Sequence, residues 1–303
     1  MGIGIVINFR YLVWDFIECG FNPYLSEKCF SGSRTHNFKY LINKPNLCNG
    51  SVFLLIAVVS APSEFDKRRA IRETWGSIVM NDAEVRLCFI WGYRSNVDQN
   101  KTQEESDRYG DIVQEDFLDS YKNLSIKSEA ILRFAFSFCP EAKYILKTDT
   151  DMFINVPILV ETLRKNTQTN MIMGFVHSGA TPYSNRKSKW FIERGYFPLT
   201  YYPDYASGTA YVLTQDVTKN LFIAALHTKY FSLEDVFITG ILRTRIRANL
   251  IHNVAFHSTK LPVDICSFKD NISAHRFSAA EIRKIWSQKH LNKSCESLSG
   301  GFG

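Results

Sequence analysis

The amino-acid sequence predicts an α/β fold with a doubly wound sheet, and three observations support this prediction. Short apolar runs rich in β-branched residues alternate with longer amphipathic segments from residue 52 to residue 147. The amphipathic segments end at residues that stop helices, namely Gly76, Gly110 and Pro140. Helices of this length between strands indicate parallel βαβ units, so a doubly wound sheet is expected.

The predicted elements follow in a regular order up to a pair of aspartates and then become mixed. In the first half we expect strands at 52–59, 85–92, 111–116 and 143–147, and helices at 64–76, 100–110 and 124–139. In the second half we expect helices at 156–165, 215–227, 234–246 and 278–290, strands at 170–176 and 207–214, and an aromatic-rich loop at 178–204. Ser278 and Glu281 have the spacing of a capping box, which marks the start of the last helix.

Composition and charge indicate a globular protein. The chain has 303 residues, of which 45% are hydrophobic and 22% charged, which is ordinary for a folded domain with a sizeable core. The net charge of +6 is spread along the chain, so nucleic-acid binding is not favoured. Residues 1–50 lack clean periodicity and predict a poorly ordered leader or stem, followed by one folded domain at 51–303.

The N-terminal residues and the sequons bear on location. An apolar stretch at 1–20 is interrupted by Arg10, Asp15 and Glu18, so it predicts neither a transmembrane helix nor a signal peptide. Seven cysteines occur without a C-x-x-C pair, which gives no support to a zinc or redox site. Five N-x-S/T sequons favour the secretory pathway; they are Asn49, Asn100, Asn123, Asn271 and Asn292.

Two carboxylates follow the predicted strand at 143–147. In extended chain Asp149 and Asp151 point to the same side, about 6–7 Å apart. Ligands bind at the carboxyl ends of strands in doubly wound sheets. Oxygen ligands there favour Mg²⁺ or Mn²⁺ shared with substrate phosphates. The alternative is an exposed turn with two solvated aspartates.

Other candidate residues each have a structural alternative. Glu234 and Asp235 precede an apolar helix, where they either favour the helix dipole or supply a general base. Gly208 beside Ser207 either marks a bulge or lets backbone approach a ligand. Trp190 is a core aromatic or a sugar-ring contact. His275 is a surface histidine or a metal ligand.

The first predicted helix adds a basic group, and several catalytic motifs are missing. Arg68, Arg69 and Arg72 form either a solvated basic face or a phosphate contact at the helix start. The sequence contains no G-x-x-x-x-G-K-S/T, H-E-x-x-H or G-x-S-x-G pattern. ATPase, zinc-peptidase and α/β-hydrolase functions therefore have no support.

Taken together, six segments resemble the β1,3-galactosyltransferase family, inverting Golgi enzymes that include β1,3-N-acetylglucosaminyltransferases. The segments lie between about Phe53 and Gln288 and follow the family's order. They are SAPSEFDKRRAIRETWG, EDFLDSYKNLSIKS, AKYILKTDTDMFIN, YPDYASGTAYVLT, LEDVF and AHRFSAAEIRKIW. Ala206 departs from the pattern, since the family usually has cysteine there.

The resemblance implies a GT-A fold, a Rossmann-like mixed sheet flanked by helices, with a UDP-sugar donor and Mn²⁺ or Mg²⁺ as cofactor. It implies that Asp151 and His275 bind the metal, that Asp149 lies near both ribose and metal, and that Asp235 is the catalytic base. It further implies Arg72 and Lys127 on the nucleotide side, and Trp190, Tyr205, Ser207, Gly208 and Glu234 on the sugar and acceptor side.

The resemblance implies transfer of a sugar, with galactose preferred, to the 3-hydroxyl of a glycan on a glycoprotein or glycolipid. A metal-bound diphosphate leaves on one side of the sugar while Asp235 accepts a proton on the other, giving a β1,3 linkage by one inverting displacement. The alternatives are N-acetylglucosamine transfer, a non-catalytic chaperone-like relative, and a nucleotide-sugar hydrolase. The family also implies a Golgi membrane protein with a lumenal catalytic domain, although no clear anchor is evident.

Overall fold

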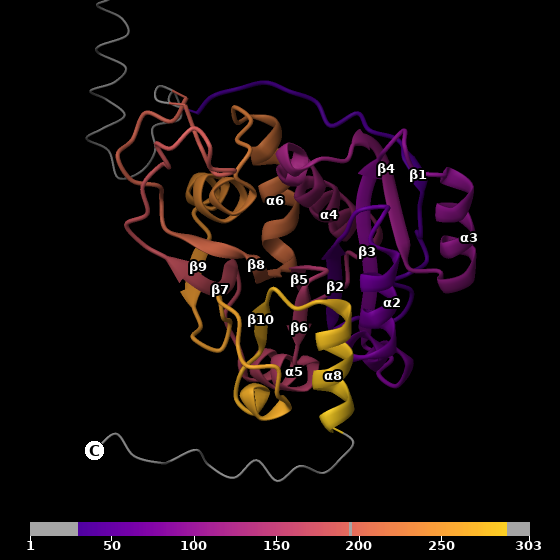
Figure 1. Ribbon diagram of the computed structural model, residues 1–303. Helices are drawn as coiled ribbons and strands as arrows, with labels where there is room; N and C mark the ends of the chain where they lie inside the picture. Colours follow the sequence, from indigo (N-terminus) through magenta and orange to yellow (C-terminus); the bar gives the residue numbers. More distant parts are fainter. Residues whose placement is uncertain (1–29, 194–195, 290–303) are drawn as a thin grey trace, which may run out of the picture.

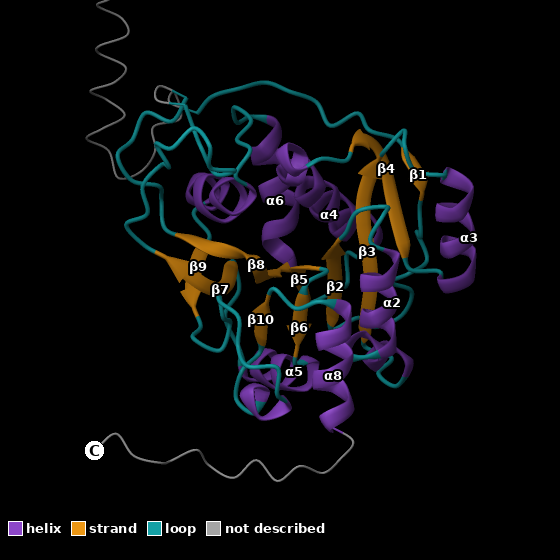
Figure 2. Cartoon of the chain, viewed as in Figure 1, coloured by secondary structure: helices purple, strands orange, loops and turns teal. Residues whose placement is uncertain are grey.

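The protein folds around an eight-stranded mixed sheet with helices on both faces. The structure is a computed structural model, and it describes residues 30–193 and 196–289. The strand order is β1-β4-β3-β2-β5-β8-β7-β9, and β6 and β10 form a separate two-stranded sheet. The predicted fold class, an α/β fold with a Rossmann-like mixed sheet flanked by helices, is confirmed (Figures 1 and 2).

The elements have the following bounds. The strands are β1 (Tyr40–Ile42), β2 (Leu54–Val59), β3 (Val85–Tyr93), β4 (Ile112–Leu118), β5 (Tyr144–Asp149), β6 (Met152–Ile154), β7 (Met171–His177), β8 (Tyr205–Thr214), β9 (Asn249–His252) and β10 (Ser273–His275). The α-helices are α2 (Phe65–Glu73), α3 (Gln99–Tyr109), α4 (Leu124–Phe138), α5 (Val156–Lys165), α6 (Gln215–Leu226), α7 (Arg243–Ile246) and α8 (Ala279–Lys289). Short 3₁₀ helices occupy Trp75–Met80, Tyr121–Asn123 and Ile265–Phe268, and a π-helix occupies Val236–Leu242.

Parallel pairing is continuous in one half of the sheet, whereas in the other half only β7 and β9 are parallel. Strands β4, β3, β2 and β5 run parallel, as the βαβ pattern predicts. Strand β8 then pairs with β5 and with β7 in the antiparallel direction. Because β8 is antiparallel, its first residues lie at the same edge of the sheet as the last residues of β5. This reversal brings segments about 60 residues apart to one place.

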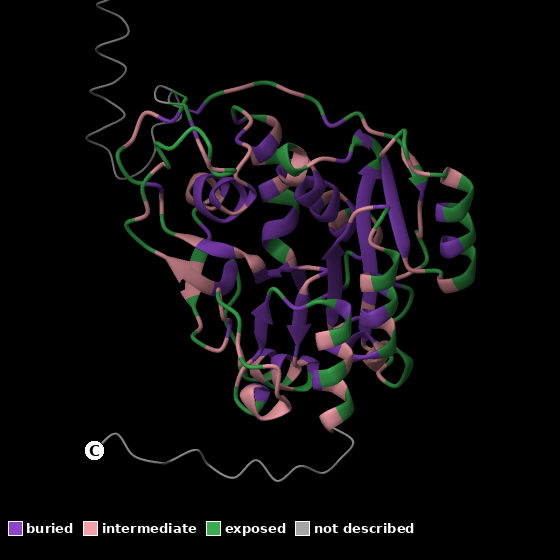
Figure 3. Cartoon of the chain, viewed as in Figure 1, coloured by how far each residue is buried: buried purple, intermediate pink, exposed green. Residues whose placement is uncertain are grey.

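Two hydrophobic cores cover the two faces of the sheet. Along β2, Leu55, Ala57 and Val59 pack into one core with residues of α4 and α6. The alternate residues Leu54, Ile56 and Val58 pack into the other core, with α2, α5 and α8. Because β2 is buried on both faces, its sequence reads as a continuous apolar run rather than an alternating one. Figure 3 shows the buried central strands between partly exposed helices.

Residues 30–50 pack against the domain, contrary to the expectation that the folded part begins near Ser51. Strand β1 pairs antiparallel with β4, and Cys48 forms a disulfide with Cys139 at the end of α4. His36 lies between two buried glutamates, with Nε2 2.7 Å from Glu115 and Nδ1 3.3 Å from Glu129. The predicted poorly ordered leader therefore does not extend through 30–50, and residues 1–29 lie outside the described part of the chain.

The helix predicted at 234–246 has an unexpected geometry. Val236–Leu242 is a π-helix and only Arg243–Ile246 is α-helical. The hydroxyl of Thr239 takes part in the hydrogen bonding of this turn, since it accepts from Ala206 N at 2.9 Å and donates to the carbonyl oxygen of Asp235 at 2.7 Å. Hydrogen bonds of this kind distort helices, and π-turns are frequent at functional sites.

Two of the predicted helix boundaries are confirmed, but the stop predicted at Gly76 is wrong, because α2 ends at Glu73 and Gly76 lies inside the 3₁₀ helix Trp75–Met80. Gly110 closes α3 in the left-handed conformation, and Ser278 and Glu281 exchange the hydrogen bonds of a capping box before α8. Within residues 30–193 and 196–289, none of the helices is long and apolar enough to cross a membrane.

Candidate active site

One large cavity lies where β5 ends and β8 begins, with a volume of about 920 Å³. Nine of the eleven residues predicted for the site line it: Asp149, Asp151, Trp190, Tyr205, Ser207, Gly208, Glu234, Asp235 and His275. Sequence reasoning thus selected residues from five separate segments that the fold brings to one place. Their chemical roles stay predictions.

The two aspartates sit at the end of β5, as expected. Asp149 is the last residue of β5 and pairs in register with Val59 of β2. Thr150 and Asp151 form a turn into β6, and the Thr150 hydroxyl donates to Glu64 at 3.1 Å. Burial, reinforced by the neighbouring charge of Asp149, raises the pKa of Asp151. A carboxylate of this kind favours a cation nearby.

His275 reaches the aspartates through strand pairing. Strand β10 pairs antiparallel with β6, and His275 stands opposite Met152, the residue after Asp151. The Nδ1 atom of His275 is buried and has no hydrogen-bond partner among the described residues. Burial and the nearby Arg276 lower the pKa of His275, so its ring is neutral and able to bind a metal.

Glu234 and Asp235 approach the cavity from the start of the π-helix. Asp235 accepts hydrogen bonds from Gly208 N at 3.3 Å and from Val236 N at 2.9 Å. Burial raises the pKa of Asp235, although these N–H groups act in the opposite direction. A raised pKa makes the carboxylate a better proton acceptor.

Glu234 is buried, and its carboxylate is hydrogen-bonded to neighbouring side chains. It accepts from the hydroxyls of Ser128 and Tyr211, each at 2.7 Å. A Cβ on Gly208 would lie 2.9 Å from Glu234 Oε2, so only glycine leaves room for this approach. The close contact explains why a glycine stands at the start of β8.

Lys147 is a residue of the site that the sequence analysis did not identify. Its ammonium is 2.9 Å from Asp149 Oδ1 and 3.5 Å from Glu234 Oε2, and it also donates to the carbonyl oxygen of Gly208. Burial alone would lower the pKa of Lys147, but Asp149 and Glu234 outweigh it and raise the pKa. A lysine two residues before an aspartate, inside an apolar strand, is the signal that could have identified it.

The comparisons with known proteins agree with these observations. The model of the galactosyltransferase family matches residues 66–254. Beta-1,3-galactosyltransferase 1 of Mus musculus and of Homo sapiens is 34% identical over 267 residues, covering 84% of this chain and 81% of the relative. The chain belongs to the galactosyltransferase family. It is therefore a glycosyltransferase.

Further relatives extend the match. Beta-1,3-galactosyltransferase 2 of Homo sapiens is 31% identical over 279 residues, covering 88% of this chain and 66% of the relative. Among solved structures, a glycosyltransferase involved in the glycosylation of the PBCV-1 major capsid is 12% identical, with a TM-score of 0.41 over 78% of this chain and 99% of that chain. The family assignment rests on the sequence relatives.

The site residues of this galactosyltransferase family member fit a divalent metal. No cluster of three or more His, Cys, Asp and Glu side chains that could hold a metal occurs in the part of the chain that the structure describes. Mn²⁺ and Mg²⁺, however, commonly complete their coordination with substrate phosphates and water. The unpartnered Nδ1 of His275 and the raised pKa of Asp151 both suit a cation beside them.

Arg72 and Lys127 do not line the cavity of this galactosyltransferase family member. The guanidinium of Arg72 pairs with Asp111 and Glu105, each at 2.8 Å. The ammonium of Lys127 is buried, 2.9 Å from Asp119 and 2.6 Å from the carbonyl oxygen of Ser60. Because acidic partners occupy both side chains, their positions do not support the predicted nucleotide contacts.

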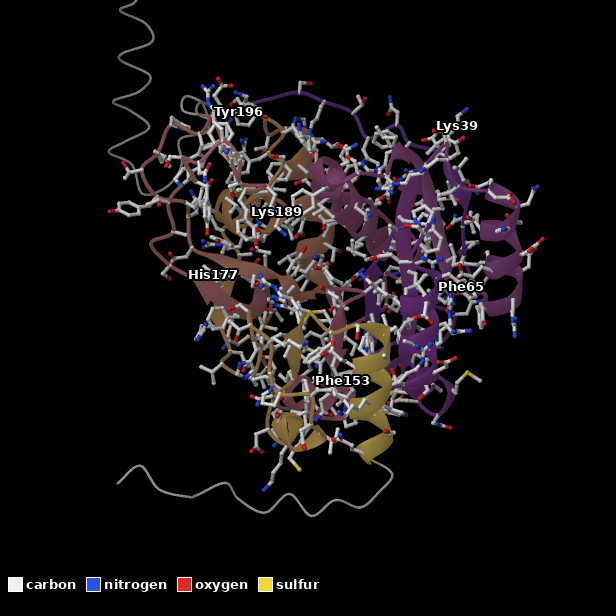
Figure 4. The ribbon with its side chains drawn as sticks, viewed as in Figure 1. Lys39, Phe65, Phe153, His177, Lys189 and Tyr196 are labelled. Atoms are coloured by element: carbon white, nitrogen blue, oxygen red, sulfur yellow. A yellow bond between two sulfur atoms is a disulfide. The ribbon has the colours of Figure 1, made fainter. Side chains whose placement is uncertain are left out.

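Tyr183 and Trp190 of the loop at 178–204, together with Tyr205 of β8, line the cavity and form an aromatic wall. The rings of Trp190 and Tyr183 are 5.3 Å apart, and the ammonium of Lys189 lies over Trp190 and Tyr121. Figure 4 labels Lys189 and His177, both of which line the cavity. Aromatic faces of this kind suit the apolar face of a sugar ring.

Proposed function

We propose that the protein transfers a hexose, with galactose preferred, from a UDP-sugar to the 3-hydroxyl of an acceptor glycan, forming a β1,3 linkage with inversion. The observation that carries this proposal is the shared cavity. It holds the Asp149–Asp151 turn with His275 and, from a different segment, the buried Asp235. This arrangement supports the proposal, because the Asp149–Asp151 turn with His275 could act on the leaving group while Asp235 acts as the base for the attacking hydroxyl.

On the leaving side, Asp151 and His275 would hold Mn²⁺ or Mg²⁺, with Asp149 next to them. The bound metal would supply charge stabilisation for the departing diphosphate. The pairing of β10 with β6 supports this assignment, since His275 stands opposite Met152, the residue after Asp151. Lys147 keeps Asp149 in place at the end of β5.

On the attacking side, Asp235 would take the proton of the acceptor hydroxyl. The N–H groups of Gly208 and Val236 orient its carboxylate, and burial raises its pKa. The acceptor oxygen then attacks the anomeric carbon, and the bond between that carbon and the UDP oxygen breaks.

The aromatic wall supports a glycan acceptor. Trp190, Tyr183 and Tyr205 line the cavity with Ser207 and offer ring faces and hydroxyls for sugar contacts. A nucleotide-sugar hydrolase would need no such wall.

We further propose that the protein works in the Golgi lumen, attached to the membrane, as its family resemblance implies. Two of its sequons are open to a glycan, because Asn49 and Asn100 are exposed. The amide of Asn271 is instead engaged with His257 and with the carbonyl oxygen of Ser267, each at 2.7 Å. Removal of N-glycans from the protein made in animal cells should reduce its mass. Asn49→Gln and Asn100→Gln should each make this reduction in mass smaller. A protein without glycans at both positions contradicts this location.

The reaction is tested by turnover with UDP-Gal, UDP-GlcNAc and UDP-GalNAc and β-linked sugar acceptors, with and without Mn²⁺. We expect transfer from UDP-Gal that depends on Mn²⁺ and is abolished in Asp151→Ala, with a β1,3 linkage in the product by NMR. Preferred transfer from UDP-GlcNAc would instead show that the protein is an N-acetylglucosaminyltransferase. Absence of transfer from every donor would overturn the proposal.

A further inference from the structure

Arg276 has an unusual backbone conformation beside the predicted metal ligands. Its φ is 70°, in the left-handed region, which residues other than glycine and asparagine rarely adopt. Such conformations persist only where the surrounding structure fixes them, and they cluster at functional sites. Arg276 directly follows His275.

Hydrogen bonds on both sides hold this conformation in place. On one side His275 pairs with Met152 across β10 and β6. On the other side Phe277 N donates to the carbonyl oxygen of Asp151 at 3.0 Å. Both neighbours of Arg276 are thus fixed to adjacent residues, His275 to Met152 and Phe277 to Asp151.

The side chain of Arg276 is exposed and lines the cavity. Three lysines and arginines line this cavity, and they differ in what they contact. Lys147 is bound to Asp149 and Glu234, and Lys189 lies over the rings of Tyr121 and Trp190. Arg276 has no hydrogen bond or ion pair with any residue in 30–193 or 196–289.

We infer that Arg276 binds the diphosphate of the nucleotide sugar and balances the negative charge that grows on the leaving group. The inference rests on the proposed function. An arginine fork can donate two parallel hydrogen bonds to phosphate oxygens, and a fixed backbone aims that fork before the substrate binds. The left-handed turn at residue 276 therefore serves to direct a cation at the anion beside Asp151.

The location favours the donor diphosphate over an acidic group on the acceptor. Arg276 is anchored to the strand pair that carries Asp151 and His275. The contacts of Asp235 instead come from Gly208, at the start of β8, and from Val236. Arg276 is therefore on the leaving-group side of the cavity.

The test is the binding of UDP and of uridine, measured by calorimetry with Mn²⁺ present, for the wild type and Arg276→Gly. Glycine accepts the left-handed backbone, so this variant removes the guanidinium without adding strain. We expect UDP to bind about tenfold more weakly, since charge-assisted hydrogen bonds are lost, while uridine affinity is unchanged. Arg276→Asn, which also tolerates this backbone, should behave in the same way. The exposed Arg186, outside the cavity, is the control, and Arg186→Gly should change neither affinity.

Three results would overturn the inference. Unchanged UDP affinity would exclude a diphosphate contact. Equal weakening of UDP and uridine would indicate a general change of the site rather than loss of a phosphate contact. An effect confined to the KM of acceptors that carry a carboxylate would assign Arg276 to the acceptor.

Failure of the proposed function would look different. A wild-type protein that binds no UDP would contradict the function, and inorganic pyrophosphate would then test Arg276 alone. Pyrophosphate binding that Arg276→Gly loses would still support a diphosphate site, and its absence in the wild type would overturn the inference as well.

Discussion

The ammonium of Lys147 lies 3.5 Å from Glu234 Oε2, and this ion pair joins the two acidic motifs of the cavity. Both side chains are almost fully buried. Lys147 also bonds to Asp149 in its own strand, so one cation is shared between the donor side and the acceptor side. The carboxylates of the cavity are therefore held at fixed positions before substrate binds.

Replacement of Lys147 by Met should destabilise the protein strongly. Removal of one partner leaves Glu234 as a buried charge without its cation, which typically costs about 3–5 kcal/mol. The free energy of unfolding from urea titrations measures this loss. Lys143→Met, at an exposed position just before β5, should cost much less.

A second substitution tests whether the buried charge is the cause. Glu234→Gln in the Lys147→Met background should recover part of the stability, because it removes the uncompensated carboxylate. Additive losses in the double variant would contradict the ion pair's role.

Replacement of Gly208 by Ala should lower turnover more than it lowers stability. The added Cβ would lie 2.9 Å from Glu234 Oε2 and 3.2 Å from Asp235 Cβ, so the base must move. Displacement of a catalytic group by about 1 Å can reduce the rate up to about 100-fold. Steady-state kcat for the two proteins provides the comparison.

Gly179→Ala is the matched control, since that glycine also lines the cavity but a Cβ there meets no atom within 4 Å. Its positive φ predicts a modest loss of stability without loss of kcat. Equal losses of kcat in the two variants would argue against displacement of Asp235.

The pH dependence of the reaction should reflect the raised pKa of Asp235. The base acts as a carboxylate, so activity is present above its pKa and falls as the pH drops through that value. Because burial raises this pKa, the acid limb of kcat/KM should lie above the titration range of an exposed aspartate. A profile measured at saturating Mn²⁺, with an acid limb at or below about pH 3.9, would contradict the assignment.

Loss of the Cys48–Cys139 disulfide should destabilise the domain. The bond closes a loop with a sequence separation of 91 and ties residues 30–50 to α4. Removal of such a crosslink typically costs about 2–4 kcal/mol. Denaturation of Cys48→Ala/Cys139→Ala under non-reducing conditions measures the loss, with Cys88→Ala, a buried unpaired cysteine, as comparison. A double variant as stable as the wild type would mean that residues 30–50 contribute little to the fold.

Much of the fold could be predicted because its signals are local. Apolar runs and helix-stopping residues predicted the bounds of β2, β3, β4 and β5 to within a few residues, and they placed Asp149 next to the end of a strand. The packing of 30–50 could not be predicted in this way. It depends on partners far along the chain, such as Glu115 and Glu129 for His36.

Contacts with distant parts of the chain also explain why some residues of the site were not predicted. Lys147 resembles an ordinary polar residue in a strand, because its partner Glu234 comes from a segment about 90 residues later in the sequence. The left-handed Arg276 has no turn residue to signal it, because strand pairing and a hydrogen bond to Asp151 impose its conformation. The acidic partners of Arg72 and Lys127 also come from other elements, so nothing in the sequence indicated that these side chains are already paired.

The most direct test of the account is the behaviour of Asp235→Asn. The substitution keeps the size of the side chain and removes its ability to accept a proton. We predict that UDP affinity stays within about threefold of the wild type while transfer from UDP-Gal falls at least about 100-fold. Full turnover by Asp235→Asn would contradict the assignment of Asp235 as the base of an inverting transfer.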